Sequence, residues 1–348
     1  MKLGIAIGYS GREMNLPVEL IQRAEQVGYD SVWTAEAYGS DAMTPLAYLA
    51  AKTERIKLCT GIIQLSARTP ANAAMQAATI DAMAGGGRVV IGIGVSGPQI
   101  VEGWYGQPWG RPYYRIKDYV QIMKKIWRRE EPVTHDGKEI ALPYHGPGSV
   151  GLGKPLKSIL HMNPDIPIVL GTGNESTVRL TGEVADGWLP LGFLPGTLEE
   201  YQPWLEQGFE RRGDGRKMDD FEVYAGVAAV VDDDVKRGLH SLKGDIALYV
   251  GGMGHKDKNF HHEVMTRRGF GDAADRIQEL YLAGRKDEAV DAVPDEWVDM
   301  KALVGPPARI KERYPKWADS GATSLVLRHP DMRAVETMAE VARLNTRG

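Results

Sequence analysis

Short apolar runs alternate along the chain with longer segments that have helical periodicity. Each run has the length of a strand, and glycines or prolines bound many of them. Runs of this kind are typical of buried strands. They predict strands over residues 3–8, 30–35, 56–64, 88–94, 168–170, 188–189, 221–231 and 324–327.

The segments between these runs repeat their apolar residues at helical spacing. In one of them, Ile116, Val120, Met123 and Trp127 fall on a single stripe. A connection long enough to hold a helix implies that the strands it joins are parallel. Strand and helix alternate along most of the 348 residues, with eight predicted strands, which favours a closed (β/α)8 TIM barrel over a doubly wound sheet.

Two segments interrupt this alternation. Residues 131–166 contain the hairpin-type turn His135-Asp136-Gly137 and are otherwise rich in glycine and proline. Residues 232–300 are polar and mainly helical in pattern. We interpret both as insertions into a single TIM-barrel domain that spans residues 1–348.

In a TIM barrel the chemistry is located where the strands end and the following loops begin. The sequence therefore predicts that the strand ends surround the site. The residues at these ends are Tyr9, Ser10, Glu36, Gln64, Val95, Ser96, Gly97, Gly171, Thr172, Gly173, Leu191, Arg328 and His329.

One of these ends has a pattern that suits an anion. Residues 167–190, PIVLGTGNESTVRLTGEVADGWLP, read as strand, glycine turn, helix and strand, with Asn174 as a candidate cap of the helix. Gly171 and Gly173 allow a close backbone approach and a positive φ, and N–H groups at a helix start favour negative charge. The alternative is a tight turn that binds nothing, and these residues alone do not decide between the two.

Composition excludes several classes of function. The formal net charge is −4, from 42 basic and 46 acidic residues, with no long run of one sign, so we expect no nucleic-acid partner and no membrane partner. Cys59 is the single cysteine, and no HExxH spacing is present, so we expect neither a disulfide nor a metal site. With no signal peptide and no bilayer-length apolar run, a cytoplasmic protein is expected.

Several short motifs occur together in a fixed order. In this order and spacing, the chain resembles the luciferase-like monooxygenase superfamily, and within it the oxidoreductases that depend on the deazaflavin coenzyme F420, such as the methylenetetrahydromethanopterin reductase-like proteins. The motifs are Trp33 to Glu36 with Thr44 to Leu46, Gly61-Ile62 with Arg68 to Pro70, Gly87 to Gly94, residues 171–177 with Ala185 to Gly187, and Gly305 to Gly321.

The resemblance implies a bacterial luciferase-like barrel and assigns cofactor contacts. Gly171, Thr172 and Gly173 would bind the cofactor phosphate, with Asn174 beside them at the helix start. Gly61-Ile62 lies where relatives have a non-prolyl cis peptide behind the deazaflavin ring. The remaining contacts, Ser96 and Gln99, would reach the pyrimidine edge of the ring.

The substrate side is less closely determined by the resemblance. Many relatives have histidine where this chain has Glu36, and a carboxylate there would either donate a proton or orient the substrate. The aromatic residues Trp109 and Tyr113 form either a substrate wall or a support for the next helix. Tyr9 and His329 are further candidates for substrate binding, although loop packing is an alternative for His329.

These features predict an F420-dependent oxidoreductase that transfers a hydride between the coenzyme and a small organic substrate. An FMN-dependent luciferase-like monooxygenase on the same barrel is the nearer alternative. A barrel that binds a phosphate-bearing ligand without catalysis is the second. Since dimers and larger assemblies are common in the family, the resemblance also predicts a homo-oligomer.

Overall fold

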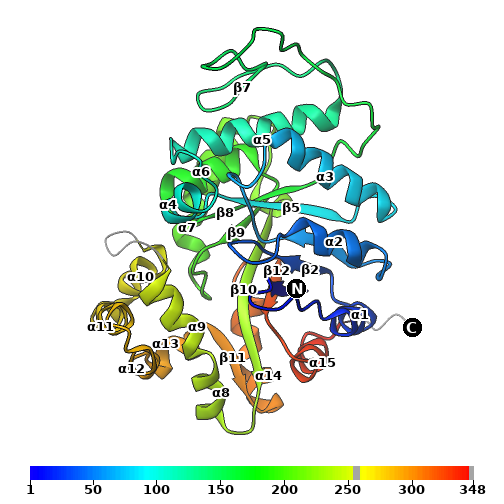
Figure 1. Cartoon of the computed structure of the whole chain (residues 1–348). Helices are drawn as coiled ribbons and strands as arrows, with labels where there is room; N and C mark the ends of the chain where they lie inside the picture. Colours follow the sequence, from blue (N-terminus) through cyan, green and yellow to red (C-terminus); the bar gives the residue numbers. More distant parts are fainter. Residues whose placement is uncertain (254–258, 345–348) are drawn as a thin grey trace.

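The computed structural model describes residues 1–253 and 259–344, and within them parallel strands close into a barrel of eight, if β4 is counted as the continuation of β3. Closure is made by β1, which pairs with β2 on one side and with β12 on the other. The predicted TIM barrel is confirmed, and helices surround it (Figure 1). In their order around the barrel the strands are β1 (Lys2–Gly8), β2 (Ser31–Thr34), β3 (Lys57–Thr60) with β4 (Ile63–Gln64), β5 (Val89–Gly94), β8 (Ile168–Thr172), β9 (Gly187–Pro190), β10 (Glu222–Val231) and β12 (Ser324–Arg328).

The surrounding helices begin where the sequence supplies a cap. Thr69, Asn174 and Asp331 each accept a hydrogen bond from a backbone N–H group of the first turn, which satisfies a donor that has no partner inside the helix. A short helix after β5 was not predicted. The helices are α1 (Val18–Gln26), α2 (Met43–Ala50), α3 (Pro70–Met83), the unpredicted α4 (Pro98–Gly103), α5 (Pro112–Arg128), α6 (Glu175–Val184), α7 (Leu198–Arg212), α14 (Pro307–Ala318) and α15 (Met332–Val341).

Residues 131–166 leave the barrel beyond α5, at the top of Figure 1. They contain the antiparallel pair β6 (His135–Asp136) and β7 (Ala141–Leu142), so the predicted hairpin is present, but His135 and Asp136 belong to its first strand and the turn follows them. The rest of the segment is an irregular excursion with many exposed side chains.

Residues 232–300 form a second group of helices, at the lower left of Figure 1. They pack around an apolar cluster of their own that includes Ile277 and Trp297. Residues 254–258 of this segment lie outside the described residues. The elements are α8 (Val235–Ser241), α9 (Lys243–Ala247), α10 (Phe260–Met265), α11 (Gly271–Leu282), α12 (Lys286–Asp291) and α13 (Asp295–Met300), with π-helical turns at Leu248–Gly252 and Thr266–Phe270.

The chain returns to the barrel through a strand that was not predicted, β11 (Ala302–Gly305). This strand pairs with the end of β10, from Ala228 opposite Ala302 to Val231 opposite Gly305. Its apolar run is short and follows a helical segment directly, so the sequence pattern did not separate it from that segment.

The interior of the barrel has a packed floor and an open upper part. Side chains alternate between the two faces of each strand, so one set points inward. Above the floor, several inward positions are occupied by glycine, among them Gly61, Gly94, Gly171 and Gly226. The floor consists of Trp33, Cys59, Val90, Val169, Tyr224 and Val326, and the single cysteine is therefore a buried core residue.

Candidate active site

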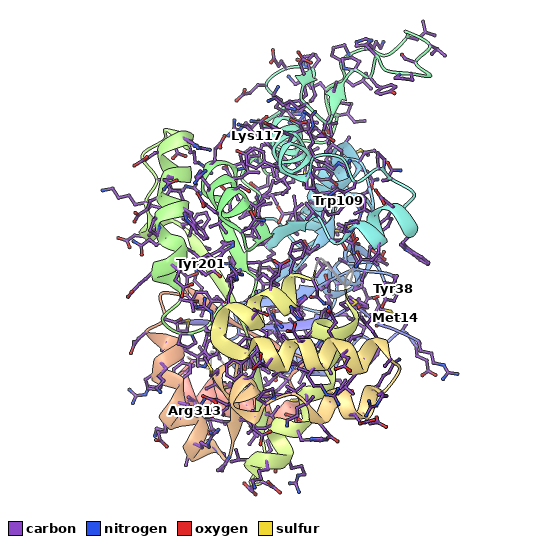
Figure 2. The ribbon with its side chains drawn as sticks, turned by 90° about the vertical axis from the view of Figure 1, so that its left-hand side faces the viewer. Met14, Tyr38, Trp109, Lys117, Tyr201 and Arg313 are labelled. Carbon is purple, nitrogen blue, oxygen red and sulfur yellow. The ribbon has the colours of Figure 1, made fainter. Side chains whose placement is uncertain are left out.

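A cavity of about 1030 Å³ opens above this floor, at the carboxyl ends of the strands. All eight strands of the barrel or the loops that follow them contribute to its lining. Figure 2 shows Tyr38 and Trp109, from the loops after β2 and β5, on the same side of the molecule, with Tyr201 and Arg313 on the other. Ligand cavities commonly measure about 300–1,000 Å³, so this one has room for a large ligand.

One side of the cavity is formed mainly by backbone. The peptide bond between Gly61 and Ile62 is cis, as the family resemblance implied. Added Cβ atoms at Gly94 and Gly171 would lie 2.9 and 3.1 Å from the Ile62 side chain, so glycine at these positions lets Ile62 lie against both strands. We call this surface, together with Gly173, the glycine wall.

The start of α6 borders the glycine wall. The Oδ1 atom of Asn174 accepts a hydrogen bond from the Thr177 N–H group at 3.1 Å. The N–H groups of Glu175 and Ser176 have no partner among the described residues and remain available to an anion. Gly171, Gly173 and Asn174 all line the cavity, so the predicted phosphate turn faces the same space as Ile62.

Two details of this turn differ from the expectation. Gly171 and Gly173 do not have a positive φ; close contacts to Ile62 and Leu191 are what favour glycine at these two positions. Thr172 lines the cavity, but its hydroxyl group is hydrogen bonded to the hydroxyl of Thr181 at 2.8 Å, beneath α6. Thr172 therefore presents mainly backbone to a ligand.

Ser96 and Gln99 both line the cavity just after β5. Ser96 has a φ of 63°, which is uncommon for a residue with a side chain and marks a sharp change of chain direction. The amide group of Gln99 lies next to Gly97, where an added Cβ would be 2.5 Å from Gln99 Oε1. Both predicted ring-edge residues are thus brought to the glycine wall.

Gln64, at the end of β4, was noted as a strand end but given no role. It is 2% exposed, and its Nε2 group donates to the Glu36 carbonyl oxygen at 2.9 Å. Its Oε1 atom is buried without a hydrogen-bond partner, although the residue lines the cavity. A buried acceptor without a partner is costly, so a ligand N–H or O–H group is a natural partner for it.

The carboxylate of Glu36 is surrounded by donors. It accepts from the backbone N–H groups of Ala42 at 3.1 Å and Gln64 at 2.8 Å. The Arg68 guanidinium adds two hydrogen bonds, at 2.8 and 2.7 Å. Since both carboxylate oxygens are already taken up by these four bonds, this geometry suits a residue that holds two loops together better than one that donates a proton.

The predicted substrate residues separate into two groups. Tyr9 and Trp109 line the cavity. Burial, together with the nearby Tyr249, raises the pKa of Tyr9 to about 12, so its hydroxyl group is protonated at neutral pH.

Tyr113 and His329 are not among the described residues that line the cavity. Tyr113 packs edge to face against Tyr114, with ring centroids 5.2 Å apart. His329 lies beside Gly8, where an added Cβ would be 2.7 Å from the imidazole ring. Because side chains alternate along β12 and Val326 points inward, Arg328 is the residue at this strand end that faces the cavity.

The side of the cavity opposite the glycine wall is formed by side chains to which the sequence analysis assigned no role. Tyr249, His261 and Arg267 come from the helical segment 232–300, and Arg328 comes from β12. We call these four residues the side-chain wall. Burial, with the positive charges of Lys301 and Arg328, lowers the pKa of His261 to about 3, so its imidazole is neutral at physiological pH.

Comparison with known proteins decides the family. The family model described as luciferase-like monooxygenase matches residues 5–324. A protein of Mycobacterium tuberculosis, provisionally named as a coenzyme F420-dependent oxidoreductase, is 43% identical over 97% of this chain and 98% of its own length. The chain belongs to the luciferase-like monooxygenase family.

Solved structures agree with the fold of this luciferase-like chain. The coenzyme F420-dependent tetrahydromethanopterin reductase of Methanopyrus kandleri has a TM-score of 0.79 at 23% identity, with 99% of each chain covered. The oxygenating constituent of 3,6-diketocamphane monooxygenase of Pseudomonas putida, in complex with FMN, has a TM-score of 0.64 at 19% identity, with 98% of this chain and 97% of that one covered. Since the family relatives are named as redox enzymes, this luciferase-like chain is an enzyme.

Two further properties concern partners and metals. Within residues 1–253 and 259–344, none of the helices combines the length and apolarity needed to cross a membrane. Over the same residues, no group of three or more histidine, cysteine, aspartate or glutamate side chains is arranged to hold a metal ion.

Proposed function

We propose that this luciferase-like enzyme uses coenzyme F420 to transfer a hydride to or from a small organic substrate. The observation that carries the proposal is the meeting of the α6 start and the glycine wall in one cavity. A phosphate-bearing planar cofactor needs both features side by side. The 43% identity to a relative named for F420 supports this cofactor in particular.

The residues present fit such a cofactor. The N–H groups of Glu175 and Ser176 suit a phosphate, and the glycines leave a surface on which a flat ring lies without meeting Cβ atoms. Ile62 would support the ring from behind. The unpartnered Oε1 atom of Gln64 would accept a hydrogen bond from a ring N–H group, next to Ser96 and Gln99 at the ring edge.

When bound, reduced F420 supplies a hydride to an electrophilic carbon, and in the opposite direction the oxidised coenzyme takes one from an alcohol carbon. The chain positions the substrate for this transfer. Tyr9 keeps its proton at neutral pH and would donate a hydrogen bond to a substrate oxygen. Glu36 would act as a positioning residue, because its carboxylate connects the loop after β2 with β4 and Arg68.

A cofactor titration tests this proposal. The purified protein is titrated with F420 and separately with FMN, and binding is followed by fluorescence. We expect micromolar binding of F420, followed by oxidation of the reduced coenzyme when an aldehyde, ketone or activated alkene acceptor is added. FMN binding in the absence of F420 binding would contradict the proposal.

The FMN-dependent monooxygenase is the second candidate, and the FMN complex of the Pseudomonas putida relative supports it. In that case oxygen uptake with FMN and a reductant would replace oxidation of F420. A phosphate-binding barrel without catalysis would instead bind F420 but leave the reduced coenzyme unchanged with every acceptor.

A homo-oligomer and a cytoplasmic location stay predictions. The excursion formed by residues 131–166 favours the first, because it exposes the apolar side chains of Val150, Leu152 and Ile159. Burial of these side chains against a second copy would remove them from water. Light scattering of the wild type and of Ile159→Lys tests this prediction, with a smaller mass expected for the variant.

A further inference from the structure

Arg328 has an unusual position for a charged residue, because it points into the interior of the barrel. It is the last residue of β12, two positions after the inward-facing floor residue Val326. It lines the cavity, and its side chain is exposed to that space. An inward-facing arginine at this point therefore serves the cavity rather than the outer surface.

The surroundings of Arg328 make room for its guanidinium group. An added Cβ at Gly226, on the neighbouring strand β10, would lie 2.8 Å from Arg328 Nε and 3.0 Å from Nη2. Glycine thus allows the guanidinium to lie against β10. Within the described residues, the side chain of Arg328 donates no hydrogen bond and forms no ion pair.

The charges nearby do not supply a counter-ion in contact. The phenol of Tyr249 and the carboxylate of Asp245 act on Arg328 only through space. Glu36, which also lines the cavity, is already paired with Arg68. Among the described lining residues, Arg267 adds a second positive charge, and Glu263 is the one carboxylate besides Glu36.

The positive charge of Arg328 contributes to the lowered pKa values of two neighbouring groups, Lys301 and His261. Burial lowers the pKa of Lys301 to about 7, and the charge of Arg328 adds to this effect. The same charge contributes to the low pKa of His261. A region that disfavours further protons favours an anion.

We propose that Arg328 forms a subsite for an oxyanion group of the substrate, a carboxylate or a phosphate ester, on the side-chain wall of the cavity. This inference rests on the proposed function, because it assigns the anion to the substrate of that same site. Arginine is suited to the role, since its planar fork binds both groups through two parallel hydrogen bonds.

The order of the strands explains why the anion belongs to the substrate and not to the cofactor phosphate. β9 and β10 separate β8, which carries the phosphate turn, from β12. Ile62 follows β3, and on the other side of the closed barrel β1 and β2 separate β3 from β12. A cofactor that extends from β8 towards β3 leaves the Arg328 side free, so a substrate held there faces the ring.

Binding of simple anions tests the subsite without a known substrate. The Gly173→Asp variant closes the phosphate turn, so any remaining binding of inorganic phosphate or acetate reports the second site. We expect calorimetry at low salt to detect at least one of the two anions with this variant. Adding Arg328→Gln should weaken that binding by about 10- to 100-fold, the usual range for a hydrogen-bonded charge, whereas Arg328→Lys should retain part of it.

Arg267→Gln, in the same Gly173→Asp background, is the matched control, because it removes a cavity-lining charge that comes from the π-helical turn Thr266–Phe270 and not from β12. It should weaken anion binding by less than about threefold. Binding of phosphate alone would assign a phosphate ester, and binding of acetate alone a carboxylate. No anion binding to Gly173→Asp, or equal losses with Arg328→Gln and Arg267→Gln, would overturn the proposal.

F420 titration of Arg328→Gln separates this inference from the proposed function. Affinity for F420 within about twofold of the wild type is expected, because Arg328 is assigned to the substrate. A loss of F420 affinity of about 10-fold or more would reassign Arg328 to the cofactor and overturn the subsite. If the wild type does not bind F420 but the anion experiment succeeds, the subsite stands and the cofactor proposal fails.

Discussion

The glycine wall and the side-chain wall face the same cavity, but they are built from different parts of the chain. The glycine wall is formed by strand ends of the barrel itself, and it presents backbone and a single aliphatic side chain, Ile62. The side-chain wall combines one barrel residue, Arg328, with residues of the helical segment 232–300. Backbone geometry suits a cofactor shared by many relatives, whereas exchangeable side chains suit a substrate that differs among them.

The largest expected effect is on the glycine wall, through Gly173→Asp. An added Cβ would already lie 3.1 Å from Leu191 Cβ, and the new carboxylate would stand next to a bound phosphate. We expect F420 affinity to fall by about 100-fold or more, because like charges placed together cost several kcal/mol. Fluorescence titration measures the loss.

Gly244→Asp is the control for charge, since an added Cβ at Gly244 meets no atom within 4 Å. It should bind F420 as the wild type does. Similar affinities for Gly173→Asp and Gly244→Asp would show that the phosphate does not bind at the start of α6.

The next effect concerns Glu36, which connects the glycine wall to the loop after β2. Glu36→Ala leaves Arg68 largely buried without its partner, which we expect to cost about 3–5 kcal/mol in the free energy of unfolding. Urea denaturation measures this cost. The double variant Glu36→Leu with Arg68→Leu should recover part of the stability, since it removes both charges.

A catalytic role for Glu36 would give a different result. Glu36→Gln would then abolish turnover while the free energy of unfolding and F420 affinity stayed close to those of the wild type. That outcome would favour proton donation by Glu36, the first of the two roles that the sequence left open.

For the side-chain wall we expect a smaller effect, in which His261 makes the free energy of unfolding depend on pH. Burial holds its pKa at about 3, below the ordinary value of 6.5. Between these values the unfolded chain binds a proton that the folded protein does not, so stability falls as the pH decreases from about 6.5 towards about 3. Urea denaturation at several pH values should show a slope steeper by up to about 1.4 kcal/mol per pH unit in the wild type than in His261→Gln. Parallel slopes would mean that the imidazole is accessible to protons in the folded state.

The smallest effects are expected for Tyr113→Phe and His329→Asn, because these two residues belong to neither the glycine wall nor the side-chain wall. Because both residues are absent from the described cavity lining, kcat/KM should change by less than about twofold. Steady-state kinetics with F420 and an acceptor measure this. An increase in KM of about 10-fold for either variant would return that residue to the substrate site, as the sequence had predicted.

Much of the fold could be predicted from the sequence, because strand and helix periodicities are local signals. The helical stripe from Ile116 to Trp127 lies within α5, and the cis peptide expected at Gly61-Ile62 is present. β11 was missed because its four residues follow a helical segment without a break in apolar pattern.

Part of the glycine wall could also be predicted from the sequence, because a glycine turn followed by a helix cap forms a continuous motif at residues 171–174. The side-chain wall leaves no such motif. His261 and Arg267 reach the cavity only because the helical segment folds back over the barrel mouth, and that contact is tertiary. The alternation along β12 was the one local signal that would have favoured Arg328 over His329.

The pairing of β10 with β11 has a consequence for how new specificities arise. The chain leaves the barrel after Val231 and returns at Ala302, on a strand hydrogen bonded to the one it left. If residues 232–301 were replaced by the equivalent segment of a relative, the new segment would be joined to the barrel at two neighbouring strands. The order of the barrel strands would stay intact. Recombination at these points offers a direct route to proteins that keep the glycine wall and change part of the side-chain wall.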